Sequence, residues 1–165
     1  MALIDEMLDE LQQEAQTTRR VLERVPDDKL EWRPHPKART LGELALHVAT
    51  VPAGVAELSM RSPAQAPQFK DPSPATAAEL ITALDQSIAT VQKLLGGMHD
   101  ETLLATWRLM DGDRELLAIP RIAFLRSIML NHWYHHRGQL SVYLRELDVP
   151  VPSIYGPSAD ETPFS

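Results

Sequence analysis

The sequence predicts an all-α protein, an antiparallel four-helix bundle forming a single domain over residues 1–165. Four long segments have apolar residues spaced three and four positions apart, the period of amphipathic helices. Proline-rich polar segments separate them, and neither a convincing sheet nor an internal repeat is evident. A chain of 165 residues is long enough for one hydrophobic core.

The first helix is predicted from Ala2 to about Arg24. It ends before Pro26, and the segment 26–39 contains three prolines that remove backbone donors, so this segment is predicted to be a loop. The apolar face of the helix consists of Ile4, Met7, Leu8, Leu11, Ala15, Thr18 and Leu22.

The second helix is predicted to start at Thr40, because Thr40 and Glu43 have the spacing of a capping box. Pro52 lies inside its apolar stripe and lacks the amide that a continuous helix uses, which predicts a kink or a break near Val51. The polar, proline-rich segment 61–74 is predicted to be a second loop.

The third helix is predicted from a second capping box, Thr76 with Glu79, to the pair Gly96-Gly97. Two apolar pieces follow between Leu103 and Pro120. They flank the turn-like sequence Asp111-Gly112-Asp113, so this region is either a short hairpin or an ordered loop.

Pro120 suits the first position of the last and longest helix. The segment 149–165 is rich in proline and serine and is predicted to be irregular. The predicted buried stripe of this helix is Leu125, Ile128, Met129, His132, His136, Leu140, Tyr143 and Leu147.

Composition excludes several classes of protein. The formal charge of −7 argues against nucleic acid as a partner, because phosphate binding needs an excess of lysine and arginine. The absence of cysteine excludes disulfides, iron–sulfur clusters and a cysteine nucleophile, so any metal is held by nitrogen and oxygen. An acidic N-terminus and the lack of a long apolar run predict a cytoplasmic protein with no membrane association.

Two histidines predict a metal site on the last helix. His132 and His136 lie about 40° apart around the helix axis, one turn apart and on the predicted buried face. Buried imidazole nitrogens need partners, and one divalent ion would satisfy both. The alternative is a pair of core histidines bonded to neighbouring side chains.

A third ligand must come from another helix. His47 is the candidate, because it is the only other histidine in a predicted helix. His135 is an alternative ligand or a residue at the rim of the site. His35, between two prolines, and His99, after the Gly-Gly helix end, are expected to be exposed.

Other polar residues of the last helix have predicted roles. Gln139 and Tyr143 lie near the direction of His132 and are the residues predicted to orient a ligand or a metal-bound species, with capping of the histidines or core filling as the alternative. Arg137 points away from the predicted stripe, which suggests a structural pairing with an acid of the tail or of a second subunit, with Asp160 and Glu161 as the candidates.

Four motifs resemble a known family. They are Trp32-Arg33-Pro34, the segments 41–47 and 132–140, and the tail 152–161. Together they are similar to the DinB/YfiT-like family. The resemblance implies a bundle with up-down-down-up connections, which is commonly dimeric. It also implies a nickel, zinc or similar ion on three side chains that match His47, His132 and His136.

The resemblance also implies a reaction class, since better-characterised members use the metal to activate a low-molecular-weight thiol. We therefore expect a metal-dependent transferase that acts with such a thiol on a small electrophile, with zinc, nickel or iron(II) as the ion. A non-catalytic metal-binding or dimeric interaction protein and a metal-dependent hydrolase are the alternatives. A homodimer is expected from the resemblance and from Trp133, which is predicted at the border of the stripe beside Tyr134 on the outer side, where apolar surface would need cover.

Overall fold

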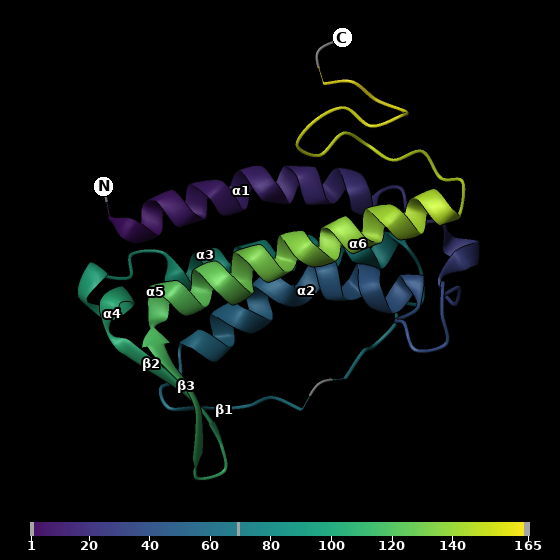
Figure 1. The fold of residues 1–165 in the computed structure, drawn as a ribbon. Helices are drawn as coiled ribbons and strands as arrows, with labels where there is room; N and C mark the ends of the chain where they lie inside the picture. Colours follow the sequence, from purple (N-terminus) through teal and green to yellow (C-terminus); the bar gives the residue numbers. More distant parts are fainter. Residues whose placement is uncertain (1, 69, 164–165) are drawn as a thin grey trace.

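Helices form most of the protein in a computed structural model that describes residues 2–68 and 70–163 (Figure 1). A 3-10 turn (Asp27–Lys29) and the short helix α4 (Asp100–Leu104) accompany the long helices. The last long helix is continuous but has three parts, of which the middle one is π-helical. The long helices are α1 (Leu3–Leu22), α2 (Leu41–Ser59), α3 (Ala78–Leu95), and α5 (Arg121–Phe124) followed by the π-helical segment Leu125–Asn131 and α6 (His132–Glu146).

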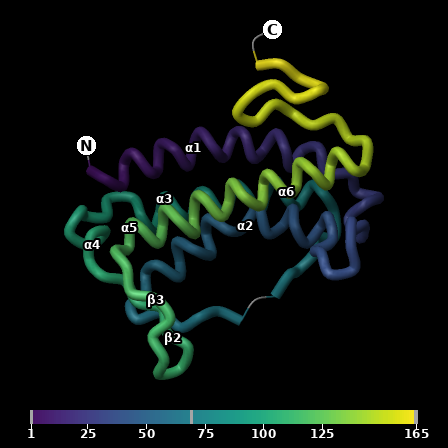
Figure 2. The backbone as a smooth tube through the Cα atoms, in the orientation of Figure 1, coloured from purple at the N-terminus to yellow at the C-terminus, as the bar shows by residue number. Residues whose placement is uncertain are grey.

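The long helices have the up-down-down-up order that the resemblance implies. Arg126 pairs with Glu10 and Arg137 pairs with Glu14, so α1 and the last helix run in the same direction. The guanidinium of Arg121, at the start of α5, donates to the Ser59 carbonyl at the end of α2 (2.9 Å), so α2 runs the opposite way. Figure 2 shows α3 parallel to α2, reached by a long connection along the outside of the bundle.

The prediction of a strictly all-α protein is wrong, because a small sheet closes one end of the bundle. Its strands have the order β1 (Ala64–Gln65), β2 (Thr106–Asp111) and β3 (Arg114–Pro120). β2 and β3 form the hairpin that the sequence left open as one of two possibilities, and β1 pairs in parallel with β2. Gly112 makes the turn with φ of 58°.

A second, smaller core explains why this hairpin is stable. Trp107 on β2 is fully buried and stacks on Phe124 of α5, with ring centroids 3.9 Å apart. Its indole N–H donates to the carbonyl of Arg61 (2.6 Å). The ring of Phe124 and the carbonyl of Arg61 lie far from Trp107 in the sequence. Local periodicity therefore does not indicate that Trp107 anchors the hairpin to the bundle.

The expected break at Pro52 is absent, and α2 is continuous from Leu41 to Ser59. Proline leaves the Val48 carbonyl without its usual amide partner, and the indole N–H of Trp133 donates to that carbonyl instead (2.7 Å). The Ala53 amide donates to Ser87 Oγ of α3 (2.9 Å). Residues of α6 and α3 therefore provide hydrogen-bond partners for the backbone groups of α2 on either side of Pro52.

Other helix ends match the sequence in part. Thr40 caps α2 with the predicted capping box, in which Glu43 accepts the Thr40 amide (2.7 Å). The second predicted box is wrong, because α3 starts after Ala77 and Glu79 accepts the Ala75 amide rather than that of Thr76. Pro120 precedes the first residue of α5.

The buried stripe of the last helix matches the predicted one in part. Leu125, Met129, His136 and Leu140 are buried as predicted, and the buried face also includes Leu130, Trp133, Arg137 and Leu144. Ile128, which was predicted to be buried, has an exposed fraction of 37%. The last helix packs against both α1 and α2, so it buries more than one face. The π-helical turns before α6 also rotate the following side chains around the helix axis, so a single stripe with a constant period does not predict all of its buried residues.

Of the helices in the described residues, α2 is long and apolar enough to cross a membrane by length and composition alone. More than half of the tested window is buried inside the protein, as in many core helices. This is weak support for a membrane span.

Candidate metal centre

The three histidines predicted as metal ligands come together between α2 and α6. The candidate ligand nitrogens of His47, His132 and His136 all lie within 4.8 Å of one another. The Nε2 atoms of His132 and His136 are 2.8 Å apart, and the ring of His47 lies 4.5 Å from that of His136 and 5.4 Å from that of His132. His136 is buried, while His47 and His132 are partly exposed.

Gln139 orients His136. Its side-chain oxygen lies 2.7 Å from Nδ1 of His136, and an amide oxygen can only accept a hydrogen bond, so the N–H of Nδ1 is the donor. This fixes the tautomer in which Nε2 of His136 carries a lone pair and faces His132. Gln139 therefore contacts the cluster through His136, which is the capping role that the sequence left open as the alternative.

One nitrogen of the cluster lacks a partner. Nε2 of His47 is buried and makes no hydrogen bond among the described residues. A buried, unpaired polar atom costs on the order of 1–3 kcal/mol, so such atoms are uncommon unless a ligand completes them. A divalent ion bound to Nε2 of His47 would remove this cost.

The imidazoles are held in the neutral form that metal binding requires. Burial lowers the pKa of His47 to about 4, and the nearby His136 and Arg39 contribute to the shift. Burial lowers the pKa of His136 to about 4 as well. Burial and the neighbouring His135 lower the pKa of His132. Near neutral pH no proton competes strongly with an ion for these nitrogens.

The donor set suits a borderline transition metal. Imidazole nitrogens bind zinc, nickel and iron(II) at roughly 2.0–2.1 Å, which places neighbouring donors about 3.4 Å apart. The candidate ligand nitrogens lie within 4.8 Å of one another, and an ion would require the 2.8 Å contact between His132 and His136 to open by roughly 0.5 Å. Among the described residues no carboxylate joins this cluster, so the ligand set is neutral.

The other histidines lie outside the cluster. His135 is exposed, and its ring centroid is 5.0 Å from that of His136, which places it at the rim. His35 is exposed and accepts the Lys37 amide (3.1 Å), and His99 is exposed before α4. The structure therefore groups the three histidines that the sequence selected.

Tyr143 lies on α6, seven residues after His136, and among the described residues it makes no hydrogen bond or ring contact with the three histidines. Its hydroxyl donates to the carbonyl of Arg39 (3.3 Å), and its ring meets Trp32 edge to face at 5.6 Å. Burial raises the pKa of Tyr143, while Arg39 opposes that shift. Arg39 was not selected from the sequence, because it lies in a loop and only the fold brings it to the histidines.

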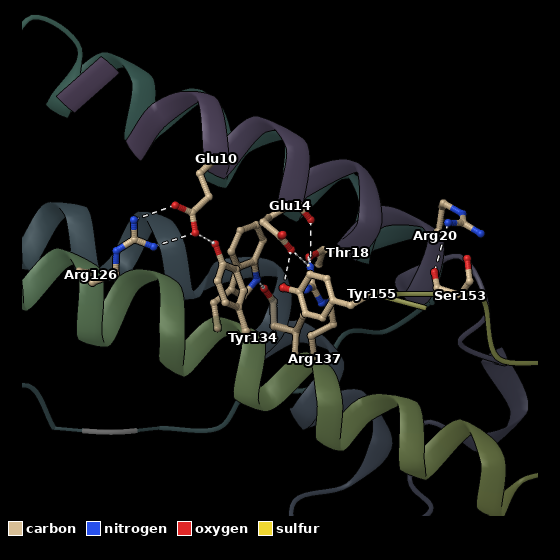
Figure 3. A network of polar contacts seen from close by, with 11 residues as sticks. Glu10, Glu14, Thr18, Arg20, Arg126, Tyr134, Arg137, Ser153 and Tyr155 are labelled. Carbon is tan, nitrogen blue, oxygen red and sulfur yellow. Dashed lines mark hydrogen bonds and ion pairs between the residues drawn. The ribbon is translucent and has the colours of Figure 1, made fainter. Parts of the chain in front are cut away.

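A polar network joins α1 to the last helix and includes Arg137, the residue after His136 (Figure 3). Arg137 is buried, contrary to prediction, and pairs with Glu14 of α1 (2.6 Å) rather than with the acids of the tail. Its guanidinium lies 5.2 Å from the ring centroids of both Tyr134 and Tyr155. This pairing fixes the residue next to His136 against α1.

The acids predicted to pair with Arg137 have other partners in the tail. Asp160 pairs with Arg145 of α6 and accepts the Val151 amide (2.9 Å), and Glu161 pairs with Arg20 of α1. The tail is irregular, as predicted, and these contacts attach it to two helices.

Known proteins resemble this chain over nearly its whole length. It is 31% identical over 159 residues to a Bacillus subtilis (strain 168) protein named "Uncharacterized protein YrdA", covering 96% of this chain and 91% of that protein. A DinB-like protein from Bacillus cereus ATCC 10987 has a similar structure, with a TM-score of 0.73 and 26% identity over 92% of this chain and 97% of the other.

A second solved structure, the DinB-like protein YjoA from Bacillus subtilis, shares the fold with a TM-score of 0.66. It is 19% identical, and the match covers 88% of this chain and 95% of the other. The model of the DinB family matches residues 1–163. The protein described here, with its three clustered histidines, belongs to the DinB family.

Proposed function

We propose that this protein is a metal-dependent transferase that joins a low-molecular-weight thiol to a small electrophile. The observation that carries the proposal is the cluster of three neutral imidazoles, whose candidate ligand nitrogens lie within 4.8 Å and include an unpaired Nε2 on His47. His47, His132 and His136 would hold zinc, nickel or iron(II).

A neutral ligand set favours an anion as the further ligand. Three imidazoles leave the charge of a divalent ion uncompensated, and four-coordinate ions with three protein ligands keep one position for solvent or substrate. A divalent ion in this site would lower the pKa of a thiol or water bound at the open position. The lack of cysteine in the chain means that a thiol would have to come from a separate small molecule.

The residues of the chain would position the reactants. Gln139 holds the ring of His136, and Tyr143 borders the centre through its contact with Arg39. In the transfer, the sulfur of the thiolate forms a bond to an electrophilic carbon, and the displaced leaving group departs with the electron pair of the broken bond. The proton of the thiol passes to solvent.

A thiol screen tests the proposal. Metal-loaded wild type and His136→Ala would be assayed with bacillithiol, mycothiol and glutathione against a monochlorobimane-type electrophile. We expect acceleration by wild type with at least one thiol, loss of the rate with chelator, and recovery with added divalent ion. Equal rates for both proteins with every thiol would contradict the transferase and favour a structural or hydrolytic ion.

A further inference from the structure

Arg39 lies just before α2, the helix that carries His47, and its carbonyl accepts the hydroxyl of Tyr143 of α6. From this place its positive charge adds to the effect of burial in lowering the pKa of His47, His132 and His136, and it opposes the rise in the pKa of Tyr143. In a chain with a net charge of −7, this places a cation beside the cluster of histidines. A cation at this place opposes protonation of the imidazoles and attracts anions.

The backbone around Arg39 is held firmly. Its carbonyl accepts the hydroxyl of Tyr143 (3.3 Å), and the next residue, Thr40, caps α2 through the box with Glu43. The Leu41 amide donates to the carbonyl of Trp32 (2.8 Å). The backbone of Arg39 and of the two residues after it is therefore fixed relative to α2 and α6, the two helices that carry the histidines.

The guanidinium already binds one carboxylate. Nε of Arg39 donates to Oδ1 of Asp71, in the connection between β1 and α3, at 2.7 Å. Both side chains are partly exposed, with exposed fractions of 29% and 39%. Among the described residues the two Nη groups of Arg39 have no hydrogen-bond partner, so the planar fork retains donors for a second anion.

We propose that Arg39 is a specificity-determining residue that binds a carboxylate of the substrate beside the metal centre, in competition with Asp71. This inference rests on the proposed function, because it names the class of small molecule that the centre takes. The preferred substrate would carry a metal-binding group, such as a thiolate, together with a carboxylate. One group would reach the ion and the other the guanidinium of Arg39.

Thioglycolate and 2-mercaptoethanol test this idea as a matched pair of probes. Both are small thiols, but only thioglycolate carries a carboxylate. Each would be titrated into the Co(II)-loaded protein, whose visible spectrum reports a thiolate on the metal. We expect wild type to bind thioglycolate about tenfold more tightly than 2-mercaptoethanol, as a charge-assisted hydrogen bond at a partly exposed site allows. The preference should decrease as ionic strength rises.

Three variants make the test specific to Arg39. Arg39→Gln should abolish the preference for thioglycolate, measured as the ratio of the two thiol affinities in that variant, while the variant still takes up Co(II) and still binds 2-mercaptoethanol. Asp71→Asn should strengthen the preference, because it removes the competing carboxylate. Arg108→Gln in β2 is the control and should behave as wild type, since Arg108 pairs with Glu115 in the hairpin.

The outcomes separate this inference from the function on which it rests. An unchanged preference in Arg39→Gln, with Co(II) and both thiols still bound, would overturn the carboxylate site and leave the proposed function intact. A protein in which neither thiol changes the Co(II) spectrum would overturn the thiol transferase, and the carboxylate site with it.

Discussion

His136 is held from two sides, which makes it the best-defined residue of the centre. Its Nδ1 faces Gln139 at 2.7 Å, and its Nε2 faces His132 at 2.8 Å. The next residue, Arg137, is buried against Glu14 of α1. Hydrogen bonds that fix a ligating imidazole commonly contribute 10-fold to 100-fold to metal affinity.

Gln139→Leu should therefore weaken metal binding by about tenfold or more, because His136 loses the acceptor that selects its tautomer. Gln139→Glu retains an acceptor at the same place and should bind the ion at least as well as wild type. Competition with a chromophoric chelator measures both affinities. Identical affinities for wild type and Gln139→Leu would show that this contact does not orient the ligand.

The lowered pKa values predict how stability depends on pH. His47 and His136 titrate near 4 in the folded protein and near 6.5 in the unfolded chain, so between these values the unfolded state binds more protons. The free energy of unfolding of the metal-free protein should therefore fall as pH falls through this window. The decrease from about pH 7 to about pH 5 should be on the order of 2 kcal/mol, allowing for solvent screening.

Urea denaturation at the two pH values measures this change, with a His47→Asn, His136→Asn double variant as the reference. The reference should lose less stability on acidification, because asparagine does not titrate. A pH dependence as steep in the double variant as in wild type would assign the effect to other groups.

At the scale of elements, α2 shows how a proline is accommodated next to a ligand. The carbonyl that Pro52 leaves open belongs to Val48, the residue after His47, and Trp133 of α6 donates to it. Trp133 in turn follows His132 in the sequence. One hydrogen bond therefore joins the two helices directly beside the candidate metal ligands.

Trp133→Phe should lower the free energy of unfolding by about 1–3 kcal/mol, because it leaves the Val48 carbonyl buried and unpaired. Pro52→Ala should recover part of that loss in the double variant, since residue 52 then has an amide for the same carbonyl. Thermal or urea unfolding of the four proteins of this cycle measures the coupling. Additive effects of the two substitutions would contradict a shared acceptor.

Local signals explain which elements were predictable from the sequence. The long helices and the capping box of α2 follow from spacing and from residues three positions apart. The hairpin anchor at Trp107 and the burial of Arg137 depend on residues far away in the chain. The metal site was predictable because two of its histidines lie one helical turn apart. Arg39 was not predictable, because it lies in a loop, where no regular spacing indicates which way a side chain points.

At the scale of the whole molecule, the homodimer remains a prediction. One of the two arguments for a dimer is wrong, because Trp133 is fully buried inside the protein and leaves no apolar surface for a second subunit to cover. The resemblance to a commonly dimeric family is the remaining support. Light scattering at micromolar concentration should give twice the chain mass of 18.5 kDa, and a mass near 18.5 kDa would contradict it.

The central claim, that three histidines from two helices hold one divalent transition-metal ion, is tested most directly by metal content. Elemental analysis would be performed on protein purified without a histidine tag, as wild type and as single alanine variants of His47, His132 and His136. His35→Ala and His99→Ala are matched controls, since both residues are exposed and outside the cluster. We expect close to one ion per chain in wild type and both controls, and a strong loss in each of the other three. Full metal content in the His47 variant, or none in wild type after exposure to zinc, nickel and iron(II), would contradict the claim.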